Sequence, residues 1–179
     1  MKTLFKYVTL FGLVLFVGCT PKLSLQSYFV AHQETDGFMS VDIPMSFLNP
    51  DKIDLTADQK EAIDSIDKLN MLAYSVKDGT EETFNSEMAK VKAILKAEIY
   101  NDLMRVGNTS DGKLYIKYIG EDSEIDELII FGFSPDKGFA VIRVLGDNME
   151  ISKIMKLDSI VDQFDTENAN IDNFMEYLL

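Results

Sequence analysis

The stretch from Leu128 to Leu145, LIIFGFSPDKGFAVIRVL, decides the fold. Its two apolar runs, residues 128–133 and 139–145, flank the loop 134–138. This loop has proline and glycine where hairpin-turn geometry favours them. Because both runs are apolar at successive positions, each strand would be buried on both faces. We therefore predict an antiparallel hairpin whose strands lie centrally in a sheet.

The sequence on either side of this hairpin extends the fold. Upstream, apolar residues recur with a period of two, which predicts strands over residues 102–107 and 113–119 joined by a turn at 108–112. With the hairpin they make a four-stranded meander. Downstream, we predict a helix over residues 149–157 and one more docked helix in the tail from Ser159.

The N-terminal half alternates helical and strand patterns. In chain order we predict a helix over residues 24–33, a strand over 38–43, a helix after Thr56, a strand over 69–76 and a helix after Thr80. Thr56 and Gln59 have the spacing of a capping box, in which each side chain bonds to the other residue's backbone N–H.

The helix after Thr80 is the longest that we predict. Phe84, Met88, Val91 and Leu95 recur every three or four residues and form an apolar stripe. Acidic residues stand at its start and lysines, including Lys92 and Lys96, towards its end, an order that suits the helix dipole.

Together these elements predict the α+β class. We expect a largely antiparallel sheet, made of the C-terminal meander and the earlier strands, with helices packed mainly on one face. Residues 25–179 have the length of a single domain. Because Cys19 is the only cysteine, we expect no disulfide, and the fold depends on packing alone.

The N-terminus is typical of a bacterial lipoprotein. A basic start precedes an apolar run over residues 4–17, which is too short for a spanning helix of ~20 residues but fits a signal-peptide core. The run ends in FVGC, which resembles the lipobox: Gly18 is the small residue before the cut and Cys19 supplies the thiol that is acylated. We predict that residues 1–18 are removed and that 19–24 form the lipidated cysteine and a short tether. The alternative is a secretory signal with an incidental cysteine.

Charge constrains the partners. The chain has 17 basic and 30 acidic residues, a formal charge of −13. Residues 1–18 contain two of the lysines and no acid, so their removal leaves −15. Such a surface repels phosphate backbones and anionic membrane faces, so we expect no nucleic-acid partner and attachment to the membrane through acylated Cys19. Because no acidic cluster follows Cys19, we expect a cell-envelope protein on the outer membrane, facing the periplasm.

The order of these patterns resembles a known family. The residues that carry the likeness are Tyr100, Leu103 to Val106, Leu114 to Lys117, Glu127 to Ile130, Phe139, Gly146, Ile151, Ile154 and Leu157. Joined to the lipobox, they are similar to the Bacteroidota lipoproteins grouped as domain of unknown function 4252. The resemblance implies a short envelope lipoprotein and implies no activity.

The sequence offers little for catalysis. His32 is the only histidine; it is either a lone base or ligand, or a histidine at the edge of the core. An acylated Cys19 cannot act as a nucleophile, and the His and Cys counts exclude a zinc site built from those residues. A serine triad would need His32, and no Gly-x-Ser-x-Gly motif supports it. We therefore predict no catalytic residues, no metal site and no cofactor.

Acidic residues form two clusters. Those from Asp51 to Asp67 are either a cation-binding or glycosidase-like face or the solvated side of the helix after Thr56, the interpretation that we favour. Those from Glu121 to Glu127 faintly resemble a calcium loop. The EF-hand interpretation fails because Glu127 and Phe133 stand where the loop needs glycine and glutamate.

One strand face suggests a binding surface. Tyr115 alternates away from its apolar neighbours and stands beside Lys113 and Lys117. This face either binds an aromatic or carboxylate ligand or is a set of cross-strand surface pairs.

From these observations we expect a lipid-anchored, non-catalytic module that binds a protein or a small molecule in the periplasm. Two alternatives remain open. One is a hydrolase that uses carboxylates, which requires two acids from separate elements with perturbed pKa values in one cleft. The other is a sensor in envelope-stress signalling that acts through a membrane-bound partner.

Overall fold

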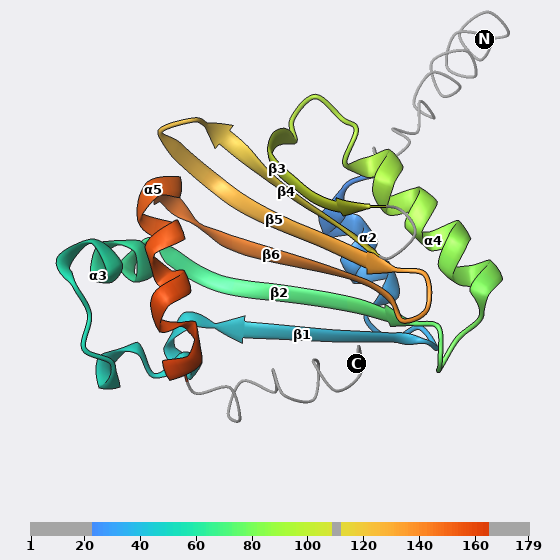
Figure 1. Cartoon of the computed structure of the whole chain (residues 1–179), viewed down its shortest axis with the longest axis horizontal. Coiled ribbons are helices and arrows are strands. Elements are labelled where there is room, and N and C mark those ends of the chain that lie inside the picture. The colour runs from blue at the N-terminus through green and yellow to red at the C-terminus, as the bar shows by residue number, and fades with distance from the viewer. Residues whose placement is uncertain (1–22, 109–111, 165–179) are drawn as a thin grey trace, which may run out of the picture.

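The computed structural model describes residues 23–108 and 112–164 (Figure 1). A six-stranded antiparallel sheet has the order β1-β2-β6-β5-β4-β3. The strands are β1 (Phe38–Pro44), β2 (Ile66–Ser75), β3 (Asn101–Asn108), β4 (Gly112–Glu121), β5 (Glu124–Ser134) and β6 (Gly138–Met149). The predicted hairpin is β5–β6 at the centre of the sheet, and β3 to β6 form the predicted meander.

Helical segments connect and cover the strands. The α-helices are α2 (Leu25–His32), α3 (Ala57–Asp64), α4 (Glu81–Ile94) and α5 (Ile151–Ile154). The 3-10 segments are η2 (Met45–Leu48), η3 (Pro50–Lys52) and η4 (Met155–Gln163). Thr80 caps α4, and Thr56 forms the predicted capping box with Gln59: the Gln59 N–H donates to the Thr56 hydroxyl at 3.4 Å, and the Thr56 N–H donates to Gln59 Oε1 at 2.9 Å.

The predicted helix over residues 149–157 differs from what is observed. Met149 belongs to β6, where it pairs with Ile125 of β5 and is fully buried. This pairing holds the backbone extended, so α5 begins only at Ile151 and gives way to the 3-10 segment η4. The tail helix was predicted from Ser159 onward, and residues 165–179 of that tail lie outside the described part of the chain.

The sheet has two differently composed faces. The aromatic face consists of Leu72, Tyr74, Ile129, Phe131, Phe133, Phe139 and Val141, on which α2 and α4 pack. The aliphatic face includes Met71, Ala73, Ile125, Leu128, Val144 and Met149, and it is covered by residues of η2, α3 and η4. Figure 1 shows α3 and α5 at one end of the sheet and α4 near the other.

The α+β class and the antiparallel sheet are confirmed, but the expectation that helices pack mainly on one face is corrected. Side chains alternate between faces along a strand, and β2, β5 and β6 are apolar at successive positions. Both faces of the central strands therefore need cover, and helical segments supply it on both.

Candidate ligand-binding site

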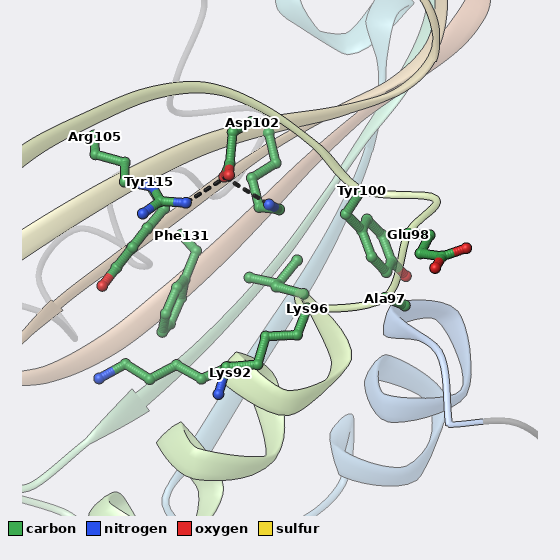
Figure 2. A pocket seen from close by; sticks show the side chains of 11 residues that line it. Lys92, Lys96, Ala97, Glu98, Tyr100, Asp102, Arg105, Tyr115 and Phe131 are labelled. Atoms are coloured by element: carbon green, nitrogen blue, oxygen red, sulfur yellow. Dashed lines mark hydrogen bonds and ion pairs between the residues drawn. The ribbon is translucent and has the colours of Figure 1, made fainter.

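A cavity of about 460 Å³ lies between α4 and the sheet, beside the edge strand β3. Its lining comes from α4, from the connection to β3, and from β3, β4 and β5. The lining residues are Lys92, Leu95, Lys96, Ala97, Glu98, Tyr100, Asp102, Arg105, Tyr115, Lys117 and Phe131. We call this space the α4 cavity. In Figure 2 Lys92 and Lys96 lie on one side and the charged residues of β3 on the other, with Tyr115 and Phe131 between them.

The amphipathic pattern of α4 places the two lysines. Phe84, Val91 and Ile94 are buried against the aromatic face and fix the rotation of the helix. Lys92, in the last turn of α4, and Lys96, just after the helix, then line the cavity (Figure 2). Neither lysine forms an ion pair with another residue of the described ranges.

Aromatic rings form one wall of the cavity. The ring of Tyr115 on β4 stacks on that of Phe131 on β5, with centroids 5.8 Å apart and an interplanar angle of 19°. Tyr115 also stacks on Phe133, with centroids 6.5 Å apart. Cations lie near these rings: Lys92 Nζ is 4.1 Å from the centroid of Phe133, and Lys113 Nζ is 5.2 Å from that of Tyr115.

A β-bulge brings opposite charges together at the cavity. The register between β3 and β4 shifts between Asp102 and Met104, so Asp102 and Arg105 lie on the same face although residues three positions apart in a regular strand point to opposite faces. Asp102 is paired with Lys117 across the strands. Lys117 Nζ lies 2.7 Å from Asp102 Oδ1, and Arg105 donates to Asp102 Oδ2 at 2.5 Å. The hydrogen bonds from Lys117 and Arg105 lower the pKa of Asp102, which is therefore an anion at neutral pH.

The lining is more basic than the protein that contains it. Four of the lining side chains are basic and two are acidic, whereas the whole chain has a formal charge of −13. A cavity with a cationic lining and an aromatic wall suits an anion that has an apolar body.

Tyr100 joins this cavity to α2. Its ring is buried at the cavity wall, and its hydroxyl oxygen accepts a hydrogen bond from the Leu25 N–H at 3.3 Å. Burial raises the pKa of Tyr100, so the hydroxyl keeps its proton at neutral pH. The start of α2 is therefore fixed to the connection between α4 and β3.

The structure brings two of the three sequence-predicted binding residues to this cavity. Tyr115 and Lys117 line the α4 cavity, and Lys113 lies over the Tyr115 ring without lining the cavity. Sequence reasoning missed Asp102, Arg105, Lys92 and Lys96. The register shift that aligns the first two has no evident sequence signature, and the lysines had already been explained by the helix dipole.

His32 lies at the edge of the core, where it contacts two acceptors. Its Nδ1 is 2.7 Å from the Tyr28 carbonyl oxygen and its Nε2 is 3.2 Å from Glu87 Oε2. Burial raises the pKa of Glu87, but the hydrogen bonds from Lys90 and Tyr28 outweigh it, so the pKa lies below its usual value. This cluster connects α2 to α4 beneath the surface.

The acidic clusters form no cation site in the described ranges. Asp58 and Glu61 form ion pairs with Lys156 and Lys153. In the second cluster Glu127 points into the protein, where it receives two hydrogen bonds from Arg143. Across residues 23–108 and 112–164, no three His, Cys, Asp or Glu side chains gather to hold a metal ion.

A second cavity of about 210 Å³ lies between α2 and the strands β1, β2 and β6. Arg143 lines it and packs its guanidinium 5.4 Å from the Phe29 ring centroid. Because the α4 cavity has about twice the volume and is lined by the Tyr115–Phe131 ring pair, it is the stronger candidate.

The predicted anchor cannot be placed on this structure. Gly18 and Cys19 lie outside the described residues. Among the helices of residues 23–108 and 112–164, none combines the length and the apolar character that crossing a bilayer requires.

Comparison with known proteins identifies a family. The chain matches the model of a family described as Domain of unknown function (DUF4252) over residues 28–157. This match confirms the predicted family, while the lipoprotein character stays a prediction from the sequence. Comparisons with curated proteins and with solved structures give no significant match.

Proposed function

The chain belongs to the DUF4252 family, and from that premise we propose that it is a lipid-anchored envelope lipoprotein. Its role is that of a non-catalytic module on the outer membrane that binds a small molecule from the periplasm. The observation that carries the binding role is the α4 cavity, because its volume falls within the ~300–1,000 Å³ of small-molecule sites.

The anchor rests on the sequence. The apolar run ends at Gly18 and Cys19, and Cys19 is the only thiol in the chain. Acyl chains on Cys19 would hold the protein at the membrane, since each buried CH₂ contributes ~0.8 kcal/mol. The acidic surface would repel the bilayer, which leaves the lipid as the main attachment. A Cys19→Ala chain should take up no labelled palmitate and leave the membrane fraction; if it stays bound to membranes, the anchoring proposal is wrong.

The charge arrangement favours binding over hydrolysis. A hydrolase that uses two carboxylates needs one of them protonated near neutral pH, with a raised pKa. In the α4 cavity, hydrogen bonds from Lys117 and Arg105 lower the pKa of Asp102 instead. The cations that surround Asp102 are suited to holding an anion, and this supports a binding role.

Native mass spectrometry of the full chain, released from its own membranes in mild detergent, tests both parts of the proposal. We expect a mass that lacks residues 1–18, carries acyl chains on Cys19 and retains a small molecule. A Lys117→Met chain prepared in the same way should lose the small molecule and keep the acyl chains. An unprocessed mass would contradict the anchor, and a bare polypeptide mass in the wild type would contradict the binding role.

A further inference from the structure

We propose that the ligand of the α4 cavity is a small aromatic carboxylate, and that its carboxylate takes the place of the Asp102 carboxylate on Lys117 and Arg105. This inference rests on the proposed function, because it names the ligand class for the same cavity. Three features of the cavity carry it: an internal anion that marks the binding position, additional cations, and a cluster of aromatic rings.

Asp102 shows how the cavity holds a carboxylate. One of its oxygens faces Lys117 Nζ at 2.7 Å and the other faces Arg105 at 2.5 Å. The Lys117 side chain is only 9% exposed and has a fixed position, whereas that of Asp102 is 47% exposed and has room to turn towards solvent. A ligand carboxylate can therefore replace Asp102 between the same two donors, and charge-assisted hydrogen bonds of this kind are the strong ones.

The other cations favour this exchange. When Asp102 turns away, the lining residues Lys92, Lys96, Arg105 and Lys117 face the ligand. Lys92 and Lys96 form no ion pair within the described residues, so they contribute positive potential that no ion-pair partner neutralises. A neutral ligand would gain nothing from this potential, and a cation would be repelled.

The aromatic wall selects the body of the ligand. The rings of Phe131 and Tyr115 are nearly parallel, at 19°, and Phe133 completes a three-ring cluster with centroids 5.9 Å from Phe131 and 6.5 Å from Tyr115. A flat aromatic ring packs against such a cluster by offset-stacked or edge-to-face contact, a contribution that an aliphatic chain does not make. Lys117 and Tyr115 both line the cavity, so one molecule with a ring and a carboxylate can contact both.

Calorimetric titration of the full chain in nanodiscs of neutral lipid tests the ligand class. The probes are 2-naphthoate, the uncharged 2-naphthalenemethanol and the aliphatic octanoate. We expect naphthoate to bind, naphthalenemethanol to bind about tenfold more weakly through loss of the charge-assisted bonds, and octanoate about threefold more weakly through loss of stacking. If naphthalenemethanol binds as tightly as naphthoate, the inference that the ligand needs a carboxylate is wrong. If octanoate binds as tightly or more tightly, the inference that the ligand needs an aromatic ring is wrong.

Variants test the exchange with Asp102. Asp102→Asn removes the competing charge, so naphthoate should bind about tenfold more tightly; weaker binding would show that Asp102 only positions the two cations and would overturn the exchange. Lys117→Met should weaken naphthoate about tenfold. Because Lys117 is buried, the exposed Lys96→Met is measured beside it and should also weaken binding. The matched control is Lys60→Gln on α3, far from the cavity lining, which should change nothing.

The failure of this inference is distinguishable from failure of the proposed function. A neutral small molecule retained in native mass spectrometry, lost in Lys117→Met, would overturn the aromatic carboxylate and keep the binding role. The absence of both a retained molecule and any naphthoate binding would overturn both.

Discussion

The two faces of the same sheet are built from different chemistry. On the aromatic face, ring contacts run from His32 through Phe38, Phe139 and Phe131 to Tyr115. Buried charges lie among these rings or beside them: Glu87, Lys117, Glu127 and Arg143. The aliphatic face is packed mainly with isoleucine, leucine, methionine and valine.

This difference indicates that one face mainly stabilises the fold and that the other carries the candidate binding site. Burying a charge costs free energy that its partner only partly repays, so a core of well-packed apolar residues stabilises at least as well. The aliphatic face has that composition. The charges on the aromatic face are therefore better explained by what they bind or position than by stability, and the α4 cavity opens on this face.

Breaking the Arg143–Glu127 pair should have the largest effect on stability. Both side chains are 9% exposed, and Arg143 donates to the two carboxylate oxygens at 2.7 and 2.8 Å. Arg143→Met leaves Glu127 buried without its cation and should lower the free energy of unfolding by about 3–5 kcal/mol in urea titrations. The double variant with Glu127→Met should recover most of that loss. A loss below about 1 kcal/mol in the single variant would contradict the cost assigned to charges on this face.

A substitution that creates a cavity on the aliphatic face should lower stability without changing ligand binding. Ile125 is fully buried there, so Ile125→Ala should cost about 3 kcal/mol through lost contacts and the space left behind. Because Ile125 does not line the α4 cavity, naphthoate affinity measured under conditions where the variant is folded should stay within about twofold. A large loss of affinity would show that the two faces are coupled.

Acid should lower the stability of the protein by protonating Glu87 on the aromatic face. This effect should be smaller than those of the two preceding variants. Hydrogen bonds from Lys90 and Tyr28 hold the pKa of Glu87 below its usual 4.5 in the folded protein. An acid whose folded pKa is depressed contributes stability above its unfolded pKa and loses it as the pH falls through the folded pKa. We expect Glu87→Gln to be less stable by about 2 kcal/mol at pH 7 and to lose less stability than the wild type between neutral pH and pH values below 4.5. Parallel pH profiles for the two proteins would contradict this.

Much of the fold was predictable because local patterns and tertiary packing agree. The apolar runs of β5 and β6, interrupted only by Arg143 in β6, favour a central position, and Thr56 and Thr80 cap their helices as the spacing predicts. The region after Met149 was not predictable in this way. There, pairing with Ile125 overrides a helical pattern that local sequence alone would favour.

The candidate site was only half predictable. The period-two alternation of β4 placed Tyr115 and Lys117 on one face, and that pairing holds in the structure. Asp102 and Arg105 join them only because the ladder shifts register at the bulge, which depends on the partner strand. Lys92 and Lys96 reach the site because α4 crosses the aromatic face at that point, a tertiary relation that helix periodicity does not contain.

The most direct test of where the protein binds its ligand is an amide NMR titration of the full chain, in neutral-lipid nanodiscs, with 2-naphthoate. The account predicts that shift changes concentrate at Lys96, Asp102 and Lys117 around the α4 cavity and leave Ile125 and Met149 of the aliphatic face unmoved. Changes centred on the aliphatic face, or no changes at saturating naphthoate, would contradict the assignment of binding to the aromatic face.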